Sequence, residues 1–281
     1  MAVNILCVGD VVGRPGRSLL ARILPKLRRQ RQIDLVVANV ENASGGSGLT
    51  VSAYHKMLTY GVNLMTLGDH AFRKREILST LVESDRIVRP ANLALEAAGK
   101  GGLVWAMPSG IKVGLVCVLG RMYMKPADCP FHAVDRIMKS FPDDCRIRLI
   151  DVHAEATSEK IAMGWYLDGR VSAVVGTHTH VATADERILP DGTAYITDMG
   201  MTGPYESVLG RRIESVLQAS TTSMPTPFKI ATGDPRLAGV FLTVDETTGR
   251  ATAIERISIA DDLPVDTPYD ADDGQKDRQM L

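Results

Sequence analysis

The chain has 281 residues, of which 45% are hydrophobic and 23% are charged, and its formal net charge at pH 7 is −1. A chain of this length can bury a sizeable core, either as one large α/β domain or as two small ones. The balanced charge gives no support for a nucleic acid such as RNA, or for an anionic membrane, as a partner. It does not exclude a local basic patch.

The first third of the chain alternates between strand and helix patterns. Apolar runs predict strands at residues 3–8, 35–40 and 62–67. Apolar residues at helical spacing predict helices at about 17–29, 52–60 and 74–83. Residues 11–17, with several turn-forming residues, and residues 43–50, rich in glycine, are expected to be loops, and residues 89–93 a connection. This order is typical of an α/β fold.

The rest of the chain continues the pattern. We expect strands at 112–119, 148–152 and 171–176, a helix at 131–141, and a further helix capped by Thr157 or Ser158. Late strands at 193–197, 240–244 and 252–257 are expected to be mainly antiparallel. No repeat or linker is evident, so residues 1–260 are expected to form one domain. Residues 261–281, acidic and proline-containing, are expected to form a loosely ordered tail.

The cysteines and the N-terminus bear on the compartment. Cys7, Cys117, Cys129 and Cys145 form no C-x-x-C pair, and two of them lie in apolar runs, so we interpret them as free thiols of a reducing compartment. The first residues show no basic segment followed by a cleavage site, and no apolar run reaches about 18 residues. A cytoplasmic protein without membrane spans is expected.

Two histidines follow the apolar run that ends at Gly176. On an extended backbone His178 and His180 would point the same way, and two neutral imidazoles that face one point are a metal-ligand arrangement. By itself the pair is equally compatible with two ordinary polar loop residues.

Polar residues recur at the C-terminal ends of predicted strands, where open α/β sheets place their ligand sites. Each one alone is readily explained as a cap, a turn former or a solvated group, but such residues end five strands. They are Asp10, Glu41, Asp69, His70, His153, His178 and His180. This set exceeds the three protein ligands of a catalytic zinc ion. It suits two divalent ions in mixed nitrogen and oxygen coordination, bridged by Glu41 or Asp10. Such a pair clamps the oxygens of a displacement at phosphorus, and the absence of thiol ligands favours iron, manganese or zinc over copper.

These residues stand in ordered motifs over residues 3–258. The motifs are Gly9-Asp10, Glu41-Asn42, Gly68-Asp69-His70, Asp151-Val152-His153 and Gly176-Thr177-His178-Thr179-His180, with residues 89–92 and 198–210 besides. The chain thereby resembles the calcineurin-like metallophosphoesterases, and most of all their YmdB-type bacterial phosphodiesterases. In that branch the usual first-motif histidine is missing. Val12 stands in its place here, and Asn42 would compensate for it.

The resemblance implies a fold, a metal centre and a reaction. The fold would be a four-layer α/β/β/α sandwich of two mixed sheets flanked by helices. Asp10, Glu41, Asn42 and His180 would hold one ion, and Glu41, Asp69, His153 and His178 the other. His70 would protonate the leaving group or stabilise the transition state, with a metal-bound hydroxide as nucleophile. The implied substrates are phosphodiesters, above all 2′,3′- or 3′,5′-cyclic nucleotides, and the implied assembly is a homo-oligomer.

Two alternatives remain at this stage. One is a metal hydrolase that acts on C–N bonds, although such enzymes carry their H-x-H early in a barrel and this one comes late. The other is a regulatory module that binds metal and nucleotide with little turnover. Asp69 makes the second credible, because the family's third motif usually reads Gly-Asn-His. The extra charge predicts tighter metal retention and a weaker Lewis acid.

Four further residues are candidates for substrate contact. Ser44 and Gly45 open a glycine-rich turn that could cradle a phosphate, although a tight turn explains the glycines equally well. Arg89 could clamp a phosphate or be a surface charge. Tyr205 could close over the site from its Gly-Pro loop or be a packing residue.

Overall fold

The structure is a computed structural model that describes residues 2–261. Of the predicted acidic tail, residues 262–281 lie outside the described residues. Its first residue, Asp261, is described: its carboxylate accepts a hydrogen bond of 2.6 Å from Nε of Arg22.

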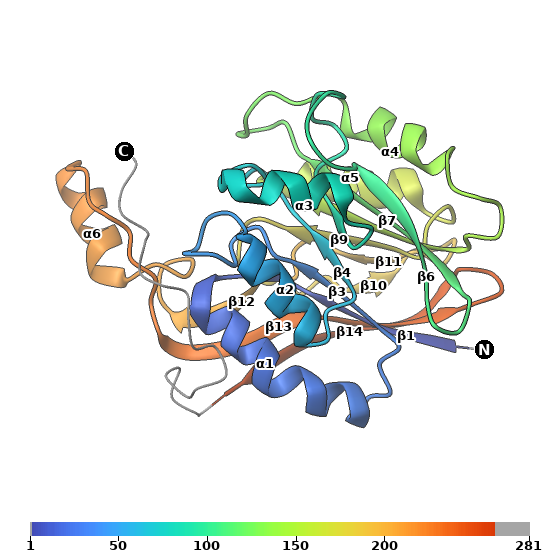
Figure 1. Ribbon diagram of the computed structural model, residues 1–281, viewed down its shortest axis with the longest axis horizontal. Helices are drawn as coiled ribbons and strands as arrows, with labels where there is room; N and C mark the ends of the chain where they lie inside the picture. Colours follow the sequence, from blue (N-terminus) through green and yellow to red (C-terminus); the bar gives the residue numbers. More distant parts are fainter. Residues whose placement is uncertain (1, 262–281) are drawn as a thin grey trace.

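Within residues 2–261, fourteen strands form two sheets (Figure 1). The larger sheet runs in the order β2 (Asp10–Val11), β12 (Met201–Glu206), β13 (Gly233–Asp245), β1 (Ala2–Val8), β3 (Leu35–Asn39), β4 (Leu64–Thr66), β5 (Ile87–Val88), and β14 (Ala251–Ala260) pairs with β13. The smaller sheet runs in the order β10 (Arg187–Ile188), β11 (Ala194–Ile196), β9 (Ala173–Thr177), β8 (Ile147–His153), β7 (Lys112–Leu119), β6 (Gly102–Ala106).

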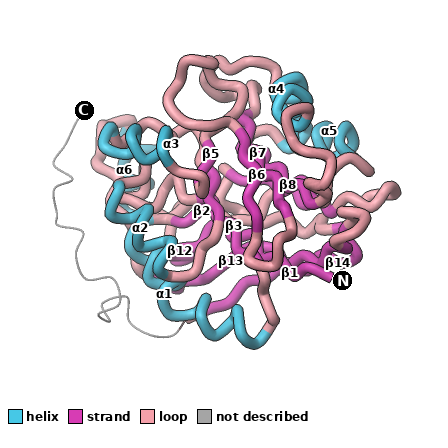
Figure 2. Tube along the Cα trace, turned by 45° about the vertical axis from the view of Figure 1, so that its right-hand side comes forward, coloured by secondary structure: helices cyan, strands magenta, loops and turns pink. Residues whose placement is uncertain are grey.

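The helices cover the outer faces of these sheets (Figure 2), except α6, which buries none of its side chains and projects away from them (Figure 1). They are α1 (Gly13–Gln30), α2 (Val51–Thr59), α3 (Leu78–Glu83), α4 (Pro130–Met138), α5 (Thr157–Leu167) and α6 (Ile213–Thr222), with a 3₁₀ turn, η1 (Arg75–Ile77), before α3. None of the helices in residues 2–261 combines the length and the apolar character that a membrane span needs.

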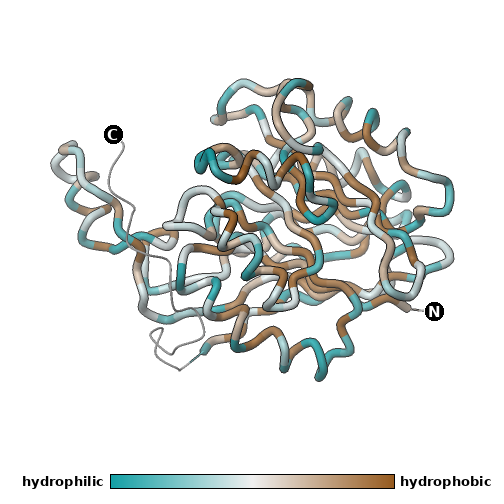
Figure 3. The backbone as a smooth tube through the Cα atoms, in the orientation of Figure 1, coloured by the Kyte–Doolittle hydropathy of each residue, from teal (hydrophilic) through white to brown (hydrophobic). Residues whose placement is uncertain are grey.

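Three separate hydrophobic clusters establish the layers. Ile5 of β1 and Leu149 of β8 belong to a cluster that lies between the two sheets. Leu6, the next residue of β1, packs with α1 and α2, whereas Ile150, the next residue of β8, packs with α4 and α5. Successive strand residues point to opposite faces, so strands covered on both faces read as continuous apolar runs, visible as brown inner strands in Figure 3. The predicted four-layer α/β/β/α sandwich is confirmed.

Several element boundaries differ from the sequence expectations. Helix α1 begins at Gly13, four residues before the predicted start, because Pro15 lies in the first turn, where a missing N–H costs no helical hydrogen bond. The predicted cap of α5 is wrong: the N-cap is Ala156, which has no capping side chain. Strand β11 was expected to be mainly antiparallel, but it pairs parallel with β9 and antiparallel only with the two-residue β10.

The parallel pairing places one set of strand ends together. β1, β3 and β4 run parallel in the larger sheet, and β7, β8 and β9 run parallel in the smaller one. The side chain of Asn39, at the end of β3, donates a hydrogen bond of 3.2 Å to Asp151 of β8. The C-terminal ends of both sheets therefore meet at one rim.

Candidate metal centre

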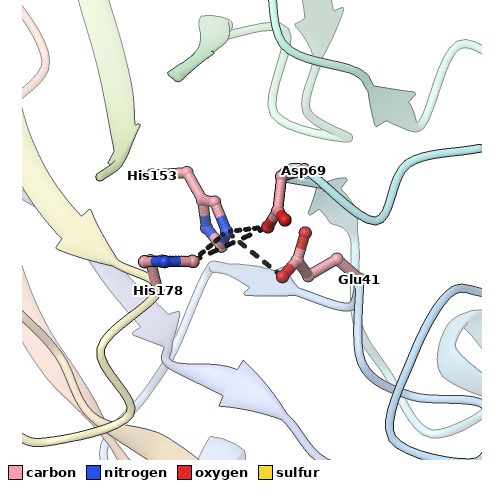
Figure 4. Close-up of side chains that lie close together, drawn as sticks. All are labelled: Glu41, Asp69, His153 and His178. Carbon is pink, nitrogen blue, oxygen red and sulfur yellow. Dashed lines mark hydrogen bonds and ion pairs between the residues drawn. The ribbon is translucent and has the colours of Figure 1, made fainter. Parts of the chain in front are cut away.

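Four of the predicted ligands converge at this rim. Glu41 follows β3, Asp69 follows β4, His153 ends β8 and His178 follows β9. One ligand atom from each lies within 4.8 Å of the others, and Figure 4 shows the two imidazoles and two carboxylates pointing toward one another. Both sheets thus contribute to the cluster, which the chain order alone does not reveal.

His153 lies at the centre of this cluster and is fully buried. Its Nε2 atom is 3.1 Å from Oε1 of Glu41 and 3.3 Å from Oδ1 of Asp69. Nδ1 of His178 lies 3.0 Å from the same nitrogen. The other nitrogen of His178 faces Oε2 of Glu155 at 3.3 Å, which leaves Nδ1 as the atom that His178 presents to the cluster.

A buried relay orients the His153 ring. Thr177 donates its hydroxyl hydrogen to Asp151 over 2.6 Å, and the same hydroxyl oxygen lies 2.8 Å from Nδ1 of His153. Because the hydroxyl hydrogen is already used, Nδ1–H of His153 must donate to Thr177. Nδ1 then carries a proton, and Nε2 is the nitrogen left to bind a metal. Metal-binding histidines commonly have such a partner behind them.

Asp10, Asn42 and His180 form a second group beside the first. Oδ2 of Asp10 accepts the backbone N–H of His178 at 3.0 Å, while its buried Oδ1 has no hydrogen-bond partner among the described residues. That oxygen lies 3.9 Å from Nε2 of His180. Nδ1–H of His180 donates to the carbonyl of Leu209 at 3.1 Å, so its Nε2 presents a lone pair toward Asp10.

Glu41 connects the two groups. Its Oε1 lies near Nε2 of His153 and also accepts a hydrogen bond of 3.2 Å from the Asn42 amide. As placed, the Asn42 amide nitrogen faces His180 at 3.1 Å. A ligand role for Asn42 therefore requires its amide to turn over, so that Oδ1 replaces the nitrogen.

Electrostatics show that the donor set fits cations. Burial raises the pKa of Asp10 to about 8, because the nearby His153 and the hydrogen bond from the His178 backbone offset only part of the cost of desolvation. Burial also raises the pKa of Glu41, but His153 and His70 outweigh it and hold that pKa well below its usual range. A buried carboxylate oxygen without a donor, beside an imidazole lone pair, is the environment that a divalent cation completes.

His70 stands at the edge of the cluster and is partly exposed. Its backbone N–H donates to Oε2 of Glu41 at 3.0 Å, and its Nδ1 lies 2.9 Å from Oδ1 of Asn42. The hydrogen bond with Glu41 raises the pKa of His70, although burial opposes the shift. The structure therefore favours the protonated imidazolium, which can donate a proton.

The loop that carries His178 and His180 differs from the expected geometry. Both residues have positive φ angles, 97° and 64°, so the backbone is not extended and the two imidazoles do not face one point. His178 turns toward Asp69, and His180 turns toward Asp10. The prediction of one shared point is wrong for this reason, whereas the division over two groups agrees with the family resemblance.

A buried ion pair holds this loop. Oδ2 of Asp198 accepts hydrogen bonds from the backbone and hydroxyl of Thr179 at 3.1 and 2.8 Å, between the two histidines. The same oxygen lies 2.7 Å from Nζ of Lys160, and both charged side chains are almost completely buried. Sequence reasoning missed Lys160, because a lone lysine in a helical segment reads as a solvated charge.

The four candidate substrate contacts have other partners here. Ser44 Oγ accepts from the backbone N–H of Thr50, the N-cap of α2, at 2.9 Å. The Arg89 guanidinium is buried and donates to the carbonyl groups of residues 90, 94 and 97. The Tyr205 hydroxyl donates to its own strand, at the carbonyl of residue 201. Gly45 adopts a φ of 64°, and its carbonyl accepts a weak bond of 3.4 Å from Arg211. A substrate role for these residues stays untested.

Comparison with known proteins assigns the family. The family of YmdB-like proteins matches residues 6–257. The chain belongs to this family. It is 44% identical over 260 residues to the 2′,3′-cyclic-nucleotide 2′-phosphodiesterase of Bacillus subtilis (strain 168), with 92% of this chain and 98% of that protein covered.

Two solved structures share the fold of this YmdB-like chain. A hypothetical protein from Thermus thermophilus is 43% identical with a TM-score of 0.86, and 92% of this chain and 99% of that chain are covered. A novel phosphatase from Mycoplasma pneumoniae is 34% identical with a TM-score of 0.87, and the coverage is 92% and 94%. The calcineurin-like fold expected from the motifs is confirmed.

Proposed function

We propose that this protein hydrolyses 2′,3′-cyclic nucleotides at a centre of two divalent cations. The reaction class, phosphodiester hydrolysis, agrees with the B. subtilis relative, whose name states that activity. The observation that carries the proposal is the cluster of Glu41, Asp69, His153 and His178 within 4.8 Å, beside the unpartnered Oδ1 of Asp10.

Two ligand sets share one carboxylate. We assign Asp10, Glu41, Asn42 and His180 to one cation, and Glu41, Asp69, His153 and His178 to the other. The contacts of Glu41 with both His153 and Asn42 support its role as the bridge. Mixed oxygen and nitrogen donors without a thiolate support iron first, with manganese or zinc as alternatives.

The side chains divide the chemical work. A pair of divalent cations supplies a water of lowered pKa and neutralises charge on the phosphoryl oxygens. Thr177 and Asp151 hold His153 in the tautomer that directs Nε2 to the cluster. His70, whose pKa is raised beside Glu41, donates a proton to the leaving oxygen. If the Asn42 amide turned over to bind a cation, its nitrogen would donate to Nδ1 of His70, and the then neutral ring would stabilise the transition state through a hydrogen bond from Nε2–H.

The test is hydrolysis of bis-p-nitrophenyl phosphate, then of 2′,3′-cyclic and 3′,5′-cyclic AMP. Each is measured with chelator and after manganese, iron or zinc is added back. We expect chelator to abolish activity, one metal to restore it, and the 2′,3′-cyclic ester to be the better substrate. His178→Ala should be inactive. His132→Ala, which removes an exposed helical histidine, should be fully active. Activity that survives chelation would contradict the proposal.

A second candidate function rests on Asp69, whose carboxylate joins the cluster where an amide is usual in the family. In this case the protein would bind two cations and a nucleotide but turn over little. Protein that holds two equivalents of metal and binds a cyclic nucleotide, yet hydrolyses neither ester, would support this regulatory module.

The domain organisation, the compartment and the oligomeric state are proposed from less direct observations. Residues 1–260 are proposed as one metallophosphoesterase domain. The cysteines, all free, support a reducing and hence cytoplasmic compartment. A homo-oligomer is proposed from the family resemblance, and the oligomeric state in solution tests it.

A further inference from the structure

A cavity lies at the opposite end of the smaller sheet from the candidate metal centre. It measures about 470 Å³, and the first residues of β8 and the loop before β9 contribute to its wall. Strand β8 runs from this cavity to His153 in seven residues, so roughly 20 Å separate the two places at about 3.3 Å per residue. The cavity volume falls within the roughly 300–1,000 Å³ of small-molecule pockets.

The cavity wall is strongly cationic. Its five basic residues come from four segments that are distant in the sequence. They are Lys139 after α4, Arg146 and Arg148 at the start of β8, Arg170 before β9 and Arg250 in the β13–β14 turn. The chain as a whole carries a net charge of −1, so this concentration is local.

The acidic residue of the cavity wall, Asp135, offsets the charge of Arg170 alone. Asp135 is bound by Arg170 at 2.5 Å and by the Tyr166 hydroxyl at 2.5 Å, and both bonds lower its pKa. Lys139 adds, from a distance, to the lowering of the Asp135 pKa. The pKa of Asp144 is lowered mainly by Lys112, and Arg146 adds to that effect from a distance. Among residues 2–261 the side chains of Lys139, Arg146 and Arg250 form no ion pair.

Hydrogen bonds and close backbone packing hold the β8 and β13–β14 parts of the cavity wall in place. Arg148 donates from Nε to the carbonyl of Cys145 at 3.0 Å. Gly249 has a φ of 74°, and a side chain there would overlap the backbone of Arg146, so the turn packs closely against β8. Asp245 accepts three hydrogen bonds from Thr247 and Thr248 and fixes that turn. A preorganised wall loses little entropy when it binds.

We propose that this cavity binds a small organic polyphosphate, such as a nucleoside triphosphate. Arginine forks match phosphate oxygens, and several unpaired cations around one cavity suit an anion with several charges. A long nucleic acid fits less well, because the adjoining cavity beyond Arg146 is lined by Asp34, Asp144 and Glu246, which interrupt the positive surface.

Calorimetric titration of the metal-loaded protein with ATP, tripolyphosphate and AMP, at physiological ionic strength, tests the site. We expect ATP and tripolyphosphate to bind, and AMP to bind at least about tenfold more weakly. Arg146→Ala/Arg250→Ala should weaken ATP binding by about tenfold or more. The matched control Lys26→Ala/Arg29→Ala removes two exposed charges from α1 and should leave binding unchanged.

The metal centre is a competing site for phosphates, so a further variant separates the two. His178→Ala should still bind ATP with wild-type affinity if the basic cavity is the site. Loss of binding in His178→Ala and its retention in the double variant would place ATP at the metal centre and overturn the proposal. An equal loss of ATP affinity in the two double variants would also overturn the proposal. So would a single-stranded RNA that binds these arginines more tightly than ATP does.

Discussion

Asp69 puts a second carboxylate into a cluster that already contains Glu41. Burial raises the pKa of Asp69, but the contact with His153 outweighs it and lowers that pKa, so the carboxylate is ionised at neutral pH. Asp69→Asn removes one negative charge from the metal ligands. We expect the variant to lose metal to a chelator about tenfold faster or more. We also expect it to turn over faster, because a cation with fewer anionic ligands is a stronger Lewis acid.

Metal content after timed dialysis and the rate on bis-p-nitrophenyl phosphate measure both effects. Asp143→Asn, at an exposed position outside the centre, is the matched control. If metal content and rate of Asp69→Asn both equal those of the wild type, the charge at this position has no influence.

Gly68 fixes how closely β4 approaches the cluster. A Cβ atom at this position would overlap Nε2 of His153 and Oε2 of Glu41. We expect Gly68→Ala to abolish metal binding while the rest of the fold persists, as judged by circular dichroism and metal analysis. Gly110→Ala is the control: its Cβ would meet nothing, and its φ of 88° strains only an exposed turn outside the cluster, so it should lose some stability but keep its metal. Full metal content in Gly68→Ala would show that the backbone shifts to make room.

At the scale of the element, hydrophobic pattern predicted most of the strands and helices that form the core. It missed six elements. Strands β2, β5 and β10 have only two residues each, and β6 was not expected either. Strand β12 contains Gly203 and Pro204, and α6 buries none of its side chains. Residue types at strand ends predicted which side chains converge, because parallel strands bring those ends to one rim. Their division into two groups did not follow from spacing, since positive φ angles at His178 and His180 have no clear sequence signal.

The loop between β9 and β11 depends on the buried pair of Lys160 and Asp198. Lys160→Met would leave Asp198 charged and buried without its partner. We expect a loss of about 3 kcal/mol in the free energy of unfolding and weaker metal binding, because Asp198 also holds Thr179 between the two histidines. Denaturant unfolding and metal titration measure the two effects.

Two further variants make this test specific. Lys125→Met, at an exposed loop position, should match the wild type in both measurements. Lys160→Met/Asp198→Asn should recover part of the stability, because it removes the unpaired charge, but should not recover metal affinity. Wild-type metal affinity in Lys160→Met would show that the loop keeps its shape without the ion pair.

At the scale of the whole molecule, the proposed metal centre draws ligands from both sheets. Cations that bind only the folded state stabilise it by roughly 2.7 kcal/mol at a free concentration one hundred times Kd. We therefore expect manganese to raise the Tm of chelator-treated protein by several degrees. His178→Ala should show a much smaller rise, and calorimetry over a series of metal concentrations measures it. An equal rise in both proteins would mean that the stabilising ions bind elsewhere.

The central place of β13 has a consequence for biosynthesis. β1 pairs with β13 over its full length, from Ala2 opposite Asp245 to Val8 opposite Gly239. One edge of β1 therefore waits for β13, which is synthesised much later, while its other edge can pair with β3 early. An unpaired apolar edge invites association between nascent chains. Chaperone occupancy should thus persist on this protein until residue 245 has been translated and has cleared the exit tunnel.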